Sequence, residues 1–205
     1  MDGMNPPAEE RPKRPAKLLL GCAGLMAVLF LGGLLLLAYW LSPAHLVTML
    51  NDGTPSTKRW AADTLIGKGA DSAGAAVLEA ASNPALDPEA RRMAVFILGE
   101  MHHTAAEPRL IALMKEGDAV LGGQAAFALG RMGDGAMLNE LLGAYDGAPK
   151  GLKLRILAAL GELGNAGAAD LINREAARAD DDLIRDTAHQ AAIKMKEKHP
   201  GGGRQ

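Results

Sequence analysis

The densest group of chemically versatile side chains in the sequence lies in one short stretch between two apolar segments. Its members, in chain order, are Glu100, His102, His103 and Glu107. Imidazole nitrogens and carboxylate oxygens are ligands that zinc and other borderline metals accept. Adjacent histidines in an extended turn point apart, however, and the other three of the five histidines are scattered. We therefore interpret the stretch as an exposed turn, and we predict no metal site and no cofactor.

Motifs for nucleophilic or phosphate chemistry are missing from the sequence. It contains no serine elbow, no Gly-Lys-Ser/Thr phosphate loop and no His-Glu-x-x-His helix. The glycines of residues 133–135 and 161–164 follow predicted helices rather than strands, which favours tight interhelical turns over a nucleotide loop. No catalytic residue is predicted, and we expect the protein not to be an enzyme.

The elements that must position any site follow an internal repeat. Residues 92–101, 123–132 and 154–163 share an apolar helical face that ends in Leu-Gly-x-Met or Leu-Gly-x-Leu. Their glycines, Gly99, Gly130 and Gly161, are 31 residues apart. A period of roughly 20 to 50 residues marks stacked units that bury their apolar faces against one another.

Each period contains two amphipathic segments separated by glycine or polar residues. Asp87 and Asp118 are predicted to begin the first helix of their units, and residues 180–182 have the same phase. The second helices are predicted at residues 75–81, 108–115, 136–144 and 168–177. Alternating strand patterns do not occur. The sequence therefore predicts an all-α fold, a right-handed α-solenoid over residues 57–198.

The repeating segments resemble a known family. Residues 92–114, 123–145 and 154–175 are similar to the short bacterial HEAT-like repeats first described in phycobilisome lyases: a basic residue, an Ala-rich helix, a Leu-Gly-x-Leu-Gly-Asp turn and an apolar second helix. Weaker outer units cover residues 58–82 and 184–198. Two features depart from the pattern. His102 and His103 replace the Gly-Asp turn, and Gly122 occupies the repeat position at which other units carry a cation. The resemblance implies helix pairs and, for function, protein binding; the alternative is an enzyme or enzyme subunit of the bilin-lyase type.

A binding surface is expected on the second helix of each unit, because the resemblance implies that these helices line the concave face. Their polar residues are the candidate partner contacts: Arg109, Lys115, Asn139, Glu140, Asp170, Asn173 and Arg174. Aromatic residues, which often dominate interfaces, are only 3 % of the chain, so few anchors are available. Trp60 is expected either to cap the core or to anchor a partner.

A charge-free run, residues 18–41, precedes the repeats. At 1.5 Å per residue it spans about 36 Å, which exceeds a hydrocarbon core of about 30 Å. The sequence thus predicts one transmembrane helix in contact with the lipid bilayer. Four cations precede the run, whereas Tyr39 and Trp40 stand near its other end. This bias predicts a single-pass protein of the cytoplasmic (inner) membrane, with a cytoplasmic N-terminus and an extracytoplasmic C-terminal domain.

Three other uses of the apolar run are weaker. Cys22 resembles a lipobox cysteine, but most of the apolar run follows it rather than precedes it. Residues 42–44 present small side chains for signal-peptidase cleavage, although the run is longer than a usual signal region of about 7 to 15 residues. Ala23 and Ala27 satisfy only the weaker spacing rule for pairing of membrane helices.

The remaining segments complete the predicted organisation. Residues 1–17 are polar and Pro-rich and are expected to form a disordered cytoplasmic tail, residues 42–56 a short helix and linker, and residues 199–205 a flexible tail. The formal net charge of −2 gives no basic surface for nucleic acid. Taken together, these features predict a membrane-anchored protein-interaction scaffold or assembly factor that binds a protein partner on the solenoid surface.

Overall fold

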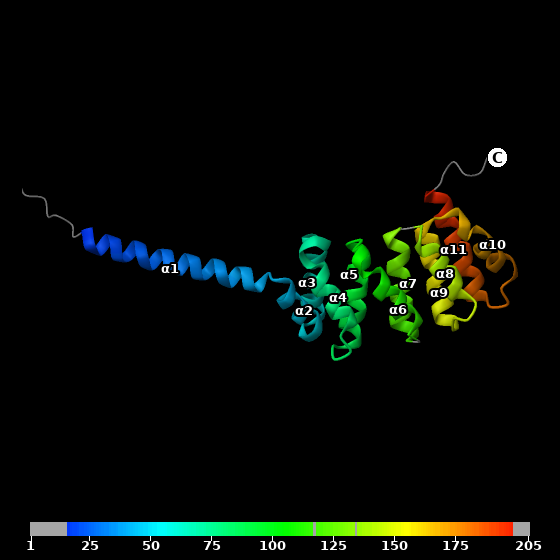
Figure 1. The fold of residues 1–205 in the computed structure, drawn as a ribbon, viewed down its shortest axis with the longest axis horizontal. Coiled ribbons are helices and arrows are strands. Elements are labelled where there is room, and N and C mark those ends of the chain that lie inside the picture. Colours follow the sequence, from blue (N-terminus) through cyan, green and yellow to red (C-terminus); the bar gives the residue numbers. More distant parts are fainter. Residues whose placement is uncertain (1–15, 117, 134, 199–205) are drawn as a thin grey trace, which may run out of the picture. The chain divides into compact units, whose positions relative to one another are not determined.

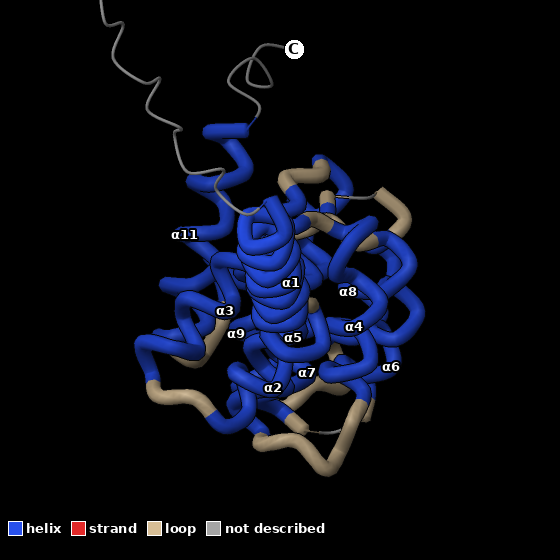
Figure 2. The backbone as a smooth tube through the Cα atoms, turned by 90° about the vertical axis from the view of Figure 1, so that its left-hand side faces the viewer, coloured by secondary structure: helices blue, strands red, loops and turns tan. Residues whose placement is uncertain are grey.

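The computed structural model describes residues 16–116, 118–133 and 135–198, with the backbone alone for residues 16–25 and 27. Within these ranges the ordered elements are helical, and no strand occurs in the tube of Figure 2. The all-α prediction is confirmed. The chain divides into two units, Met1–Ser42 and Pro43–Gln205. The predicted tails at residues 1–17 and 199–205 lie outside the described residues, except for Ala16 and Lys17, which begin the first helix.

The first unit contains one long helix, α1 (Ala16–Trp40). From Val28 to Leu37 its large apolar side chains are exposed. In the described part of the chain, no single helix is long and apolar enough to cross a membrane, although the segments Val28–Trp40 and Pro43–Asp52 reach that length and composition as a bent pair. The transmembrane helix predicted over residues 18–41 is not supported by this finding and stays a prediction.

The second unit is a stack of helices that follow one another in chain order (Figure 1). One row consists of α3 (Pro55–Lys68), α5 (Pro88–Glu100), α7 (Ala119–Met132), α9 (Lys150–Leu163) and α11 (Asp182–Lys198), which pack side by side. A second row consists of α4 (Ala70–Ser82), α6 (Glu107–Lys115), α8 (Met137–Tyr145) and α10 (Ala169–Arg178). Each second-row helix packs chiefly against the first-row helix that follows it. This arrangement is the α-solenoid that the repeat predicted.

The array begins earlier along the chain than residue 57. α2 (Pro43–Asp52) packs against α3, and its Leu46 and Leu50 are fully buried in the common core. The side-chain oxygen of Asn51 also accepts a hydrogen bond of 2.8 Å from the backbone N–H of Asp87. The expected short helix within residues 42–56 is therefore one half of the first helix pair, because its apolar face has no other place to be buried.

Aspartates begin the helices where the period predicted them. A side-chain oxygen of Asp87 accepts from the N–H of Glu89, and one of Asp118 accepts from the N–H groups of Val120 and Leu121. These bonds satisfy amide groups that have no partner inside the helix, and each such cap stabilises its helix by about 1 kcal/mol. The repeated aspartate therefore fixes where α5 and α7 start.

The periodic glycines let the first-row helices approach closely. A Cβ placed on Gly99 would lie 2.8 Å from Cα of Ala128, and one on Gly130 would lie 2.7 Å from Cα of Ala159. Gly161 meets Ala191 in the same way, at 2.8 Å. No real side-chain carbon tolerates these distances, so each glycine faces the backbone of the next helix in the row. The spacing of the row is thus set by the glycine that ends each repeat motif.

Ion pairs join neighbouring repeats at the same period. In three of them the partners are 31 residues apart, and in the fourth 32: Lys58–Glu89, Glu100–Arg131, Lys150–Asp181 and Glu162–Lys194. In each pair at least one side chain is about a third or more exposed, and such partly exposed pairs contribute roughly 0.2–1 kcal/mol each. Their consistent spacing favours the register in which each helix lies beside its counterpart one repeat away.

Substitution of Gly130 by alanine tests the close approach. Gly130→Ala is expected to lower the free energy of unfolding by about 1–3 kcal/mol, because the added methyl group overlaps the backbone of α9. Gly143→Ala is the matched control: Gly143 also lies in a helix but has no atom within 4 Å of an added Cβ, so a gain of about 0.5–1 kcal/mol is expected. Urea unfolding followed by circular dichroism measures both. Equal effects of the two substitutions would contradict the packing account.

Candidate protein-binding surface

The seven predicted contact residues lie on three helices of the second row. Arg109 and Lys115 belong to α6, Asn139 and Glu140 to α8, and the last three to α10: Asp170, Asn173 and Arg174. The first-row helices pack more closely than the second-row helices. In a bent stack the more closely spaced row lies on the inner side, so this geometry favours the first row as the concave face. The seven residues as a binding set stay a prediction.

Four of these seven side chains form ion pairs within the protein. Lys115 of α6 is 2.7 Å from Glu140 of α8, so this pair connects two helices of the row. Arg109 pairs with Glu116, and its Nε donates to the hydroxyl of Ser82 at 3.2 Å. The remaining pair, on α10, is formed by Arg174 with Glu175 at 3.3 Å. A charged partner would have to compete with these intramolecular contacts.

The end of α8 shows how the second row is held by its neighbours. Tyr145 is only 2 % exposed, and Nζ of Lys153 lies 5.1 Å from the centre of its ring. Burial, together with the nearby Glu175 carboxylate, raises the pKa of the Tyr145 hydroxyl above its ordinary value. Tyr145 is therefore a neutral core residue, whereas Trp60 is 47 % exposed on α3.

The first row carries two hollows that the sequence reasoning missed. One, of about 490 Å³, lies over α7, α9 and α11. The second, of about 350 Å³, continues along α9 and α11 and shares Ala158 and Thr187 with the first. The signal that would have found them is a difference between repeats: Ala158 occupies the phase at which the two preceding repeats have Phe96 and Phe127. The surface is hollowed where the large ring is absent.

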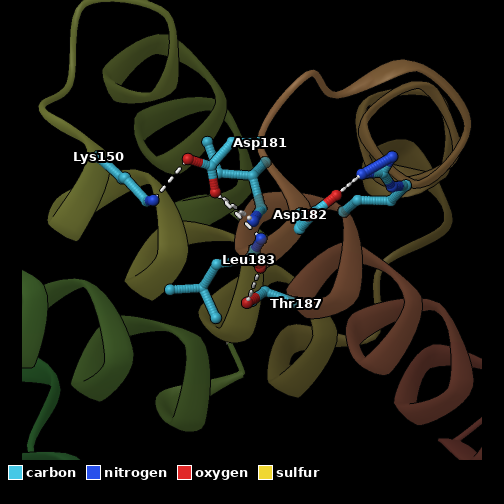
Figure 3. A network of polar contacts seen from close by, with 7 residues as sticks. Lys150, Asp181, Asp182, Leu183 and Thr187 are labelled. Atoms are coloured by element: carbon cyan, nitrogen blue, oxygen red, sulfur yellow. Dashed lines mark hydrogen bonds and ion pairs between the residues drawn. The ribbon is translucent and has the colours of Figure 1, made fainter.

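A polar network fixes the first turn of α11 beside these hollows (Figure 3). Asp181 forms an ion pair with Lys150 of α9 and accepts hydrogen bonds from the N–H groups of Leu183 and Ile184. The hydroxyl of Thr187 donates to the carbonyl of Leu183 at 2.7 Å. Mainly through the hydrogen bond from Lys150, this network holds the pKa of Asp181 below its ordinary value.

The histidine stretch forms the turn after α5. His102 has a left-handed backbone (φ 51°) at the phase where the next two repeats have Gly133 and Gly164. Its Nδ1 is 3.2 Å from the carbonyl oxygen of Glu100, and the His103 ring occupies the space beside Gly74 in α4. No group of three or more His, Cys, Asp or Glu side chains is placed to hold a metal ion in the described ranges. The His102 ring is thus exposed at its own turn, whereas the His103 ring packs against α4.

The comparisons agree with this geometry. The family model described as HEAT repeats matches residues 75–152. This part of the chain is similar to HEAT repeats. A solved structure with the same arrangement is "The structure of the complex of CpcE and CpcF of phycocyanin lyase from Nostoc sp. PCC7120", with a TM-score of 0.55 and 19% identity, over 96% of this chain and 71% of that chain. The search of the curated proteins gives no match.

The match to the lyase complex corrects one prediction. From the missing motifs we expected a protein that is not an enzyme, and the likeness to a phycocyanin lyase contradicts that expectation. The motif search failed because it looked for local nucleophile and phosphate signatures, which a helical repeat array does not need. At 19% identity the likeness shows the fold alone.

The network around Asp181 gives a prediction about acid stability. Because its folded-state pKa is lowered, the carboxylate stabilises the folded state at neutral pH, and this contribution is lost as the pH falls through the folded-state pKa. Asp181→Asn is therefore expected to lower the melting temperature at pH 7. The difference in melting temperature from the unsubstituted protein should disappear well below pH 4, which is roughly the pKa of a free aspartate. Asp180→Asn, at the neighbouring exposed position, is the control. A gap that does not change with pH would refute the electrostatic explanation.

Proposed function

We propose that this protein is an interaction scaffold or assembly factor whose HEAT-like array binds a protein partner. The observation that carries the proposal is the array itself: five helix pairs from α2 to α11 in the described chain, held by glycine contacts and ion pairs between repeats. Such a stack offers a long and rigid surface of exposed helices, which suits extended partners. The solved array that it resembles is itself a complex of two proteins.

We further propose that residues 18–41 anchor the array in the cytoplasmic membrane, with the N-terminus in the cytoplasm and the array on the outer side. The support is the charge-free sequence and the unbroken helix α1, whose 25 residues correspond to about 37 Å. Large apolar side chains are exposed on all sides of the described part, as expected for a helix surrounded by lipid. Anchoring would raise the effective concentration of the array for a membrane partner.

A second candidate function is that of an enzyme or enzyme subunit of the bilin-lyase type. Its support is the likeness to the CpcE and CpcF complex of phycocyanin lyase. In both candidates the array recognises another protein, so the two differ in what happens after binding. A lyase component changes the covalent state of a bilin acceptor, whereas a scaffold changes where its partner is held.

Labelling of a single cysteine tests the membrane topology. Ala177 is exposed on α10, and Cys22 is the only cysteine in the chain, so Ala177→Cys in a Cys22→Ser background provides one reactive site. A maleimide that does not cross membranes is expected to label this variant in intact spheroplasts. Labelling that appears only after lysis would place the array in the cytoplasm and reverse the proposed orientation. If carbonate alone, without detergent, extracts the protein from membranes, that result would argue against the anchor.

Photo-crosslinking tests the proposed binding function. A crosslinking amino acid at Asn173 on the second row, or at Gln190 on the first row, is expected to give a discrete adduct with a partner from one of the two faces. Asp63, exposed on α3, is the control position. The same weak smear at all three positions would contradict partner binding.

Incubation of the full chain with a free bilin and an acceptor protein tests the second candidate function. The measurement is the bilin fluorescence of the acceptor in a denaturing gel.

A further inference from the structure

The larger hollow on the first row combines an apolar lining with a single charge. Its lining residues all come from three successive first-row helices, and those that the argument uses are Val120, Gly151, Leu154, Arg155, Ala158 and Thr187. Gly151 and Ala158 lack the side-chain atoms that would fill the space, and Leu154 and Val120 contribute apolar carbon. Arg155 is the only charged residue of this lining. The hollow is therefore suited to an apolar group with a negative charge beside it.

Arg155 differs from four cations of this row that form ion pairs between repeats. Lys58, Arg131, Lys150 and Lys194 each pair with a carboxylate one repeat away. Within the described residues Arg155 makes no ion pair, and one repeat earlier its phase is held by the neutral Gln124. Its aliphatic stem lies against Gly123 of α7, where an added Cβ would be 2.7 Å from Cγ. The stem is thus held in place by packing while the guanidinium remains exposed and unpaired.

The hollow is open rather than enclosed. Val120 is 59 % exposed, and both Gly151 and Arg155 are also exposed. A small molecule that binds tightly usually has most of its surface buried, which an open depression of this kind does not provide. A side chain presented by a protein segment needs less enclosure, because the rest of the segment contacts the flanking helices. The geometry therefore favours a peptide segment over a free small molecule.

We propose that this hollow receives an apolar side chain, of the size of leucine, from a partner segment that places an Asp or Glu carboxylate next to it. The apolar side chain is buried against Leu154 and Ala158, and the carboxylate pairs with the guanidinium of Arg155. Charge complementarity of this kind sets the orientation and the partner preference more than the affinity. The inference rests on the proposed partner-binding function and names the chemistry of that partner.

Fluorescence anisotropy with defined peptides tests the recognition. The probes are three labelled ten-residue peptides: a leucine flanked by glutamates, the same leucine flanked by lysines, and a serine flanked by glutamates. The full chain is expected to bind the first peptide, and to bind each of the other two about tenfold or more weakly. The lysine peptide lacks the carboxylates, and the serine peptide lacks the apolar side chain. Equal binding of the lysine peptide, or no binding of the first peptide, would overturn the proposal.

Two variants connect the binding to the hollow. Ala158→Phe is expected to fill it and to reduce binding of the glutamate–leucine peptide at least about tenfold, and the fold should tolerate this change because Phe96 and Phe127 occupy the same phase. Arg155→Gln is expected to weaken the same peptide and to reduce the dependence of its binding on salt. Asp63→Asn, at an exposed position of α3 that does not line the hollow, is the control and should change nothing. Unchanged binding by Ala158→Phe with an unchanged melting curve would overturn the assignment to this hollow.

A failure of the proposed recognition at the hollow can be distinguished from a failure of the proposed partner-binding function. If an adduct forms at Asn173 while the peptides fail to bind, the array binds its partner by the second row, and only the inference about the hollow fails. If the glutamate–leucine peptide binds and Ala158→Phe abolishes its binding, the recognition chemistry stands even where no partner is crosslinked. An absence of both adduct and peptide binding refutes both proposals.

Discussion

The structure depends on how closely two helix backbones can approach each other. Gly99, Gly130 and Gly161 each face a small residue of the next first-row helix, at distances that no side-chain carbon could occupy. Close approach brings the flanking leucines of both helices into one core, so that Leu98, Leu129 and Leu160 are fully buried. This contact places equivalent residues of successive repeats side by side from α5 to α11.

The sequence was sufficient to predict the fold because the fold is determined by local, repeated signals. The glycine period, the aspartate caps and the absence of strand patterns together predicted helix pairs in a stack, and each signal can be read within a dozen residues. The packing partner of each helix was harder to predict. The motif suggests that α5 and α6 form a unit, whereas α6 packs chiefly against α7, because linear order alone does not say on which side a helix is buried.

The sequence could say less about the candidate surface, for two physical reasons. Polar residues on the second row were identified by their phase, but their ion pairs, such as Lys115 with Glu140, join residues on different helices and cannot be read from either helix alone. The hollow was missed because it results from a missing side chain. Ala158 looks like an ordinary helix residue until it is compared with Phe96 and Phe127, and only the packed neighbours turn that difference into space.

The ion pairs between repeats also restrict how such an array can change its length. At the position after each periodic glycine the charge alternates in sign: Glu100, Arg131, Glu162 and, one residue further, Lys194. Deletion of the single repeat around Arg131 would bring Glu100 beside Glu162, and duplication of that repeat would set two arginines next to each other. Gain or loss of two repeats preserves the alternation. Each like-charged neighbour would replace one ion pair, so the alternation favours changes of two repeats over changes of one by only roughly 0.2–1 kcal/mol per pair.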